Sequence, residues 1–119
     1  MIRKFLYTIL ISVILINTCS CALLQKTMDN RTGFSAQLKQ TENFIRSEEW
    51  NKAKSSLEDS KKTWKKLKPL LQIDIDHDYV NSIEENFVKL DGFIDTEAKA
   101  YSLSTILLVE YTWDNIGSL

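Results

Sequence analysis

Two five-residue stretches, "FIRSE" at 44–48 and "FIDTE" at 93–97, carry nearly the same sequence 49 positions apart. The similarity extends further when residues 41–67 are set against residues 90–116. Leu57 then falls opposite Ile106, and Trp64 falls opposite Trp113. Because the matches cluster at the short stretch and at the far end of the segment after it, we interpret the two segments as copies of one structural unit.

The shared stretch is typical of a corner between two helices. Its Phe-Ile pair forms the apolar end of the first helix, which predicts that Phe44 and Phe93 are buried. Ser47 and Thr96 are expected to be N-caps of the second helix, because a hydroxyl oxygen accepts a backbone N–H at the start of a helix. The glutamate after each cap then lies in the first turn, where the helix dipole favours negative charge.

The hydrophobic pattern on both sides of each corner indicates helices. Apolar residues recur at alternating steps of three and four, as they do on the buried face of a helix. This spacing predicts four helices, at about 34–46, 48–68, 77–94 and 96–115. The last of them has a broader apolar face, with "ILLV" at 106–109, which indicates a more central position. The sequence therefore predicts an all-α fold with two helical hairpins packed as a small four-helix bundle.

An uncharged, mostly apolar segment, "FLYTILISVILINTCSCALL" at 5–24, comes after Arg3 and Lys4 near the N-terminus. A helix of this length rises about 30 Å, which matches the hydrocarbon core of a bilayer. The basic pair before the segment keeps the N-terminus in the cytoplasm and directs the chain beyond Leu24 to the outside. We therefore expect residues 1–24 to be an anchor or signal segment, and residues 25–119 to be an exported helical domain on a single-pass protein of the bacterial cytoplasmic membrane.

Two other fates are open to the N-terminal segment. It could be a cleaved signal peptide, or its Cys21 could carry a lipid, as in a bacterial lipoprotein. Ser20 and Cys19 before Cys21 are suitably small, but Thr18 stands where leucine is usual, and the apolar run continues to Leu24. The uncleaved anchor is the favoured prediction, with the lipoprotein as the alternative.

The charge and cysteine content restrict the function of the exported part. The exported part has no excess of basic residues, because the net charge of the whole chain is −1 and this charge includes the basic Arg3 and Lys4 of the N-terminal segment. The expected location of this part is outside the cytoplasm. We therefore expect no nucleic-acid partner. Both cysteines fall within residues 5–24, which leaves the exported part without a thiolate nucleophile or a disulfide.

The chain has one histidine, His77, within "DIDHD" at 74–78. Zinc requires three or four ligands that converge in space, whereas adjacent residues that enter a helix splay apart. Acidic residues are also preferred at the start of a helix. We interpret this stretch as the beginning of a helix, and we expect no metal, no cofactor and no catalytic residue.

Other candidate residues have structural interpretations as well. Glu84 and Glu85 are expected on a solvated face, opposite Ile83 and Phe87. The lysines of "KKTWKKLK" at 61–68 are expected to pair with acidic residues of the next helix, or else to contact anionic lipid or an anionic wall polymer. Trp64 and Trp113 are expected in the core.

The chain resembles a known family of small bacterial proteins. The resemblance rests on the apolar N-terminal segment, "EEW" at 48–50 followed by Ala53, Trp64, "IDHD" at 75–78, "SIEENFVKLDGFI" at 82–94 and the leucine-rich last helix. These features are similar to the family called domain of unknown function 4363, found mainly in clostridia-type Gram-positive bacteria. The family's "HxEID" motif stands here as "HDYVN" at 77–81, with His77 kept. The resemblance implies one N-terminal membrane segment and an exported helical part, and it implies no activity.

These observations together predict a protein that is not an enzyme. We expect a membrane-anchored helical module outside the cytoplasm that contacts another envelope protein or a second copy of itself. The alternative is a binding protein for a small apolar or anionic ligand, held between the helical hairpins near the tryptophans.

Overall fold

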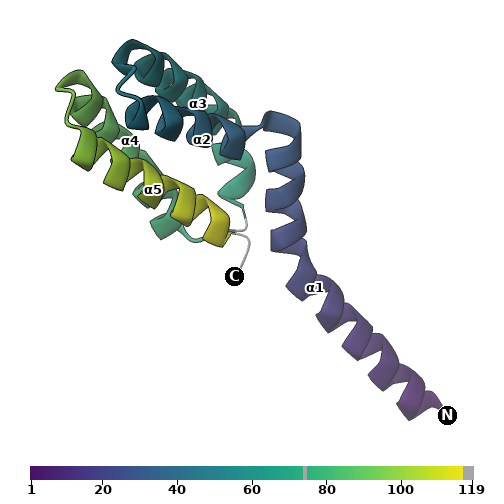
Figure 1. The fold of residues 1–119 in the computed structure, drawn as a ribbon. Coiled ribbons are helices and arrows are strands. Elements are labelled where there is room, and N and C mark those ends of the chain that lie inside the picture. The colour runs from purple at the N-terminus through teal and green to yellow at the C-terminus, as the bar shows by residue number, and fades with distance from the viewer. Residues whose placement is uncertain (74, 117–119) are drawn as a thin grey trace.

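The computed structural model describes residues 1–73 and 75–116, with all their side chains except those of residues 14–22. This part of the chain contains helices and no strand, which confirms the all-α prediction. The helices are α1 (Ile2–Thr32), α2 (Phe34–Arg46), α3 (Trp50–Leu71), α4 (His77–Asp95) and α5 (Lys99–Ile116) (Figure 1).

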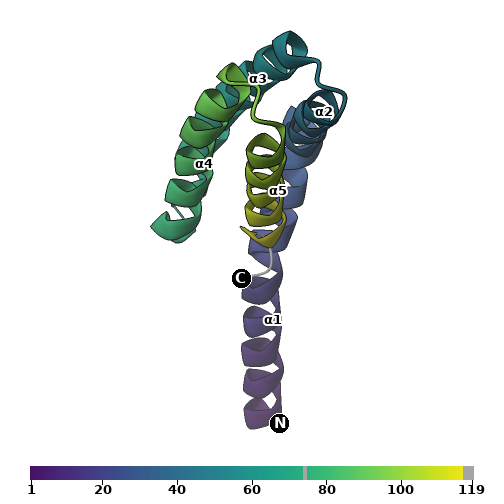
Figure 2. The same cartoon turned by 60° about the vertical axis from the view of Figure 1, so that its left-hand side comes forward.

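The four helices α2–α5, called here the helical domain, pack in two antiparallel pairs. The α2–α3 pair lies against the α4–α5 pair, so that α2 contacts α5 and α3 contacts α4. Helix α1 touches this domain only through its C-terminal turns and then runs away from it, so the N-terminus lies far from the other helices (Figure 2).

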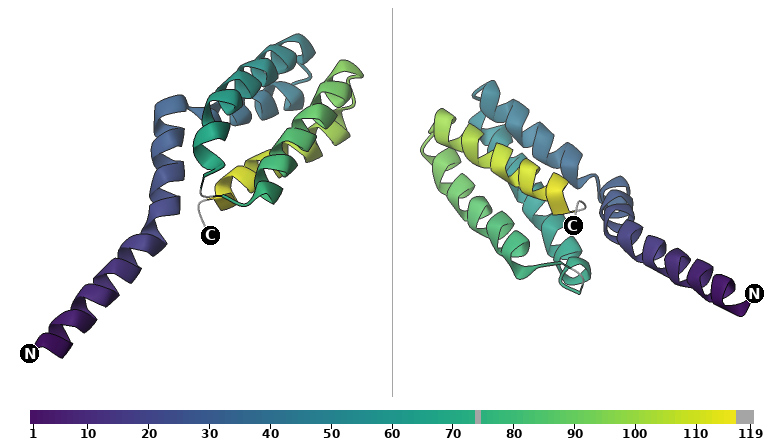
Figure 3. Two further views of the ribbon diagram at one scale, coloured as in Figure 1. Left: turned by 180° about the vertical axis from the view of Figure 1, so that it is seen from behind. Right: turned by 90° about the horizontal axis from the view of Figure 1, so that it is seen from below.

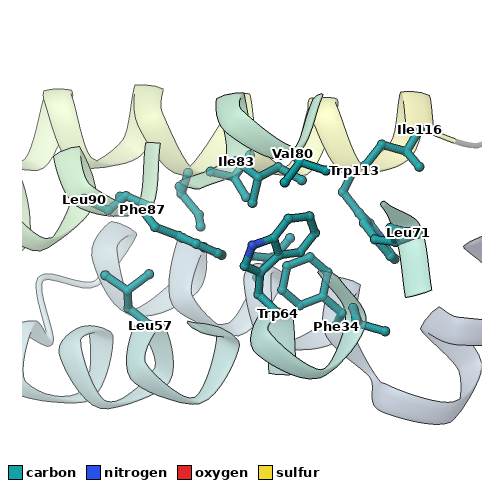
Figure 4. Close-up of a cluster of buried hydrophobic side chains, with 14 of the residues drawn as sticks. Phe34, Leu57, Trp64, Leu71, Val80, Ile83, Phe87, Leu90, Trp113 and Ile116 are labelled. Carbon is teal, nitrogen blue, oxygen red and sulfur yellow. The ribbon is translucent and has the colours of Figure 1, made fainter. Parts of the chain in front are cut away.

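The core of the helical domain contains one large aromatic side chain from each helix. Phe34 of α2 lies 5.8 Å from the ring of Trp64 in α3 and 4.8 Å from the ring of Trp113 in α5, between ring centroids. The ring of Phe87 in α4 meets Phe34 edge-on at 6.4 Å. Figure 4 shows this cluster with the aliphatic side chains around it. Trp64 and Trp113 are both buried, as their spacing in the sequence predicted.

Helix α1 is continuous through the predicted boundary between residues 24 and 25 and ends at Gly33, whose φ of 66° is the left-handed conformation that stops a helix. Its last turns are attached to the helical domain. The side-chain amide of Gln25 donates to the Trp113 carbonyl at 3.4 Å, and the Asp29 carboxylate accepts from the Ser35 N–H at 2.8 Å.

Among the described residues, no helix combines the length and the apolar character needed to cross a membrane. The predicted segment 5–24 includes residues 14–22, whose side chains lie outside the described part, and the alternative lipidation site at Cys21 lies there too.

The two corners have the same backbone geometry, and the chain reverses direction at each (Figure 1). Glu48 and Glu97 both have positive φ, at 57° and 54°. In the first corner the Glu48 N–H donates to the Ile45 carbonyl at 3.1 Å, and the Glu49 N–H donates to the Phe44 carbonyl at 2.9 Å. The equivalent bonds of the second corner measure 3.0 and 2.8 Å. This is the Schellman arrangement that ends a helix through one left-handed residue, and it confirms the duplicated corner.

The predicted N-caps are wrong. Ser47 and Thr96 end the first helix of each pair instead of beginning the second, and each hydroxyl donates to the carbonyl four residues back, at 3.1 and 2.9 Å. The reason is the left-handed glutamate directly after each of them, which is not in a first helical turn as predicted. The next helix therefore begins later than expected, at Trp50 and at Lys99.

The predicted burial of Phe44 and Phe93 is also wrong, since both side chains are half-buried. Lys52 lies over the Phe44 ring, 5.8 Å from its centroid, and Tyr101 stacks on Phe93 at 5.3 Å.

The corners predict an unusual stabilising substitution. A non-glycine residue in the left-handed region destabilises the folded state by about 1–2 kcal/mol. Glycine removes this strain, but it also makes the unfolded chain more flexible, which offsets part of the gain. Glu48→Gly and Glu97→Gly should therefore each raise the free energy of unfolding by about 0.5–1 kcal/mol, measured by urea denaturation. Glu49→Gly is the matched control, because Glu49 has φ −85°, and it should not stabilise. Destabilisation by both corner variants would contradict the assigned backbone.

Candidate functional site

The duplication extends from the corners to the contacts between the two helix pairs. Across α2 and α5, the Trp113 indole N–H donates to the Ser35 hydroxyl at 2.9 Å. Across α3 and α4, the indole N–H of its repeat equivalent Trp64 donates to the Glu84 carboxylate at 3.2 Å. Ser35 and Glu84 are themselves 49 positions apart. The α2–α5 and α3–α4 grooves are therefore equivalent places in the fold.

The charges in the two grooves differ at one pair of equivalent positions. In the α3–α4 groove, the Lys61 ammonium contacts the Asp91 carboxylate at 2.6 Å. In the α2–α5 groove, the same two positions are occupied by Glu110 and Glu42. An ion pair on one side is thus replaced by two carboxyl groups on the other, called here the acidic pair.

Glu42 is the buried member of the acidic pair, with 3% of its side chain exposed. Lys39 Nζ contacts one carboxylate oxygen at 2.5 Å, and Arg46 Nε donates to the other at 2.7 Å. Burial disfavours the charged form of Glu42, but the hydrogen bonds from Lys39 and Arg46 outweigh it and lower the pKa of this carboxyl. Glu42 is therefore held as a carboxylate.

Glu110 has the opposite behaviour. Burial and the nearby Glu42 carboxylate raise the pKa of Glu110 from its ordinary 4.5 to about 7, against a smaller lowering by Lys39. Two adjacent carboxyl groups resist the loss of both protons, because the second charge would lie next to the first. Glu110 is thus a half-buried carboxyl that gains and loses a proton near neutral pH.

A pocket of about 410 Å³ opens over the acidic pair, between α2 and α5. It is lined by Ser35, Ala36, Leu38, Lys39, Glu110, Trp113 and Asp114. Glu110 is the member of the acidic pair that lines the pocket. The pocket therefore offers one titrating acid beside one lysine and the edge of a buried indole.

A second feature lies on the outward side of α5. Tyr101, Leu107, Leu108 and Tyr111 follow helical spacing, and between 41% and 67% of each is exposed. These four residues are called here the α5 stripe. Helix α5 contacts α1, α2 and α4, which agrees with the predicted central position, but it buries only one part of its broad apolar face and leaves the rest in solvent.

The repeat shows that the fold does not require the α5 stripe to be apolar. The equivalent positions on α3 are the charged and exposed residues Lys52, Glu58, Asp59 and Lys62. Isolated exposed apolar residues are normal on protein surfaces, but a clustered set at positions that accept charge elsewhere in the same chain indicates a binding face.

A family model described as Domain of unknown function (DUF4363) matches residues 21–118. The chain belongs to this family. The resemblance found from the sequence is thereby confirmed. No curated protein and no solved structure matches the chain.

The remaining candidates of this DUF4363 chain have structural roles. His77 is exposed and begins α4, and the Asp76 carboxylate caps that helix by accepting from the Asp78 N–H at 3.3 Å, as predicted. Asp74 lies outside the described residues. Among the described residues, no three potential ligands converge on a metal position.

The predicted interpretation of the charged residues on α3 and α4 is correct only in part. Lys68 pairs with Glu84 at 2.5 Å and Lys61 pairs with Asp91, so the expected pairing between these helices is confirmed for two of the five lysines. Glu85 is exposed, as predicted. Glu84 is only partly solvated, with 38% of its side chain exposed, because it also accepts from the Trp64 indole across the α3–α4 groove.

Sequence reasoning missed both Glu42 and Glu110. The repeat alignment contained the signal, since it places Lys61 opposite Glu110 and Glu42 opposite Asp91. Glu110 is also the one acid within the apolar run "ILLVEYTW" at 106–113. A lone carboxyl in such a run is a candidate for a raised pKa.

The acidic pair predicts how the stability of this DUF4363 chain depends on pH. A carboxyl whose pKa is raised on folding contributes stability below its unfolded value, and this is lost as the pH rises through about 7. The free energy of unfolding should fall by about 1–3 kcal/mol between pH 5 and pH 8, measured by urea denaturation. The lowered pKa of Glu42 acts at the other end, where stability is lost as the pH falls below its ordinary value.

Two variants isolate the contribution of Glu110. Glu110→Gln should remove most of the decline between pH 5 and pH 8, because the amide does not titrate. Glu110→Lys recreates the charge pattern of the α3–α4 groove and should also remove the decline. Glu85→Gln, at an exposed position, is the control that keeps it. An unchanged slope in both Glu110 variants would refute the assignment.

Proposed function

We propose that the protein is a non-enzymatic docking module of the bacterial envelope. In this proposal residues 5–24 hold it in the cytoplasmic membrane as a single-pass helix, or Cys21 holds it there through a lipid. Its helical domain is a small four-helix bundle outside the cytoplasm. The α5 stripe of this domain binds another envelope protein or a second copy of the chain.

The observation that carries the proposal is the contrast between α3 and α5. Their buried positions match along the repeat, from Leu57 and Ile106 to Trp64 and Trp113. Their exposed positions differ, because α3 carries charges where α5 carries the stripe. Burial of apolar side chains against a partner is favourable by roughly 25 cal/mol per Å². The α5 stripe lowers the solubility of the free domain, and a partner that covers the stripe would offset this cost.

The attachment to the membrane is supported by the segment itself. Residues 5–24 are uncharged and mostly apolar, and α1 carries them away from the helical domain (Figure 2). Exposed apolar side chains along the first half of α1 include Phe5, Leu6, Leu10 and Ile11. These side chains have no partner in the helical domain and would be covered by lipid.

A small ligand in the α2–α5 pocket is the second candidate. The pocket lies between the two hairpins beside Trp113, and its volume falls within the range of small-molecule sites. The lining disfavours an anionic ligand, because Glu110 and Asp114 outnumber Lys39, which leaves an apolar ligand against Leu38 and Trp113 as the form of this candidate.

Site-specific photo-crosslinking tests the docking proposal. A benzophenone amino acid at Leu108 of the full-length chain, expressed in a Gram-positive host, should give one discrete protein adduct. The same amino acid at Asp59, the repeat equivalent on α3, should give none. The mass of the adduct distinguishes a second copy, at twice 13.8 kDa, from another protein.

Two further substitutions separate the stripe from the pocket. Leu107→Glu should reduce adduct formation at Leu108 at least tenfold, because a charge at the centre of the interface would be desolvated. Ala36→Trp, which fills the pocket, should leave the adduct unchanged. Loss of the adduct with Ala36→Trp alone would favour the ligand, and equal labelling at Asp59 and Leu108 would refute the docking proposal.

A further inference from the structure

The end of α3 presents apolar side chains to solvent in a fixed orientation. Leu71, the last residue of the helix, is fully buried in the core. The buried Leu71 side chain holds the end of α3 against the rest of the helical domain, so the side chains of the residues next to it project into solvent. Leu70 is 54% exposed, and Ile73 in the loop after the helix is 80% exposed. Neither is needed to fill the core.

Three lysines precede these apolar side chains along the last three turns of α3. Lys62, Lys65 and Lys66 are exposed on α3, and none of the described acidic side chains lies within ion-pair distance of them, although the Glu58 carboxylate attracts Lys62 and Lys65 from further away. The repeat equivalent of Lys65 on α5 is Asp114, so the fold accepts an acid at this position. Lys62, Lys65, Lys66, Leu70 and Ile73 are called here the α3 tip.

Acidic groups also lie near the α3 tip, at the start of α4. Asp76 and Asp78 are exposed there, and the Asp76 carboxylate is engaged in capping its own helix. Lys68 and Glu84 neutralise each other at 2.5 Å. The lysines of the α3 tip, spread over the last three turns of α3, are therefore charges on this helix without an ion-pair partner among the described residues.

The α3 tip lies at the end of the domain from which α1 departs. Leu71, Trp113 and Ile116 gather at one end of the core cluster (Figure 4). The Gln25 side chain attaches α1 to the Trp113 carbonyl at this same end. The two corners lie at the opposite end, as the views from behind and below show (Figure 3).

We propose that the α3 tip rests on the anionic lipid surface of the membrane in which α1 is held. Lysines beside exposed apolar side chains match an interface with charged headgroups above and acyl chains below. An anionic wall polymer would engage the lysines but leave Leu70 and Ile73 in water, so lipid fits the whole surface better. The inference rests on the proposed attachment through residues 5–24.

Lipid-dependent quenching tests this contact in the full-length chain. Cys19 and Cys21 are replaced by serine, and a bimane fluorophore is attached to Ile73→Cys or, as the control at the far end, to Asn51→Cys. Each chain is reconstituted in vesicles of phosphatidylglycerol and phosphatidylcholine that carry nitroxide lipids. Quenching should be several-fold stronger at position 73 than at position 51, and it should fall in vesicles of phosphatidylcholine alone.

The lysines are tested in the same vesicles. Lys65→Glu with Lys66→Glu should lower the equilibrium constant for the docked state by at least about 25-fold, since each lysine near an anionic surface contributes about fivefold. Lys52→Glu with Lys54→Glu, at the far end of α3, should leave it unchanged. Equal quenching at positions 73 and 51 would overturn the inference, as would tighter binding to poly(glycerol phosphate) than to the vesicles.

Sedimentation with vesicles separates this inference from the proposed membrane attachment. A chain that sediments with all vesicles but shows no quenching at position 73 contradicts the α3 tip and leaves the attachment standing. A chain that sediments only with anionic vesicles, and only with Lys65 and Lys66 intact, supports the α3 tip and contradicts residues 5–24 as the anchor. A chain that sediments with neither vesicle overturns both.

Discussion

The helical domain depends on one contact group, in which Phe34 of α2 meets an aromatic ring from each of the other three helices. Phe34 comes directly after Gly33, so the residue that ends α1 also brings this ring into the core. Removal of a buried phenylalanine typically costs about 3–5 kcal/mol, a large share of the stability of a domain this small. The chain has no cysteine in this part, so no disulfide compensates for such a loss.

Around this centre, the two halves of the domain solve the same packing problem with different polar groups. Both buried indoles donate a hydrogen bond across a groove, but one acceptor is a serine hydroxyl and the other is a glutamate carboxylate. Nearly one helical turn before each indole, both grooves carry a pair of ionisable side chains, but one pair is of opposite charge and the other is acidic. The acidic pair is the less stable solution at neutral pH, because Glu110 must bear its charge beside Glu42. The chain thus has a lysine–aspartate ion pair in one groove and two carboxyl groups at the equivalent positions of the other.

The helices, the corners and the buried tryptophans could be predicted from the sequence, because hydrophobic spacing and a repeated pentapeptide are local signals. The caps could not, because Ser47 and Thr96 fit either end of a helix, and the left-handed glutamates that decide between the two ends have no strong sequence signature. The acidic pair and the α5 stripe required knowledge of which faces are buried. Glu110 and Leu108 belong to one apolar run, and only the packing of α5 against α2 and α4 assigns the first to a groove and the second to solvent.

The repeat has a consequence for the surfaces that the domain can present. Helix α2 is equivalent to α4 and α3 to α5, so the contact of α2 with α5 and that of α4 with α3 are the same interface used twice, as in a symmetric dimer of hairpins. Two identical hairpins paired in this way would present identical outer faces. Within one chain the two copies can differ, and the outer face of α3 carries charges of both signs where the outer face of α5 carries the apolar stripe. One small domain thus has two different surfaces on a framework that is used twice.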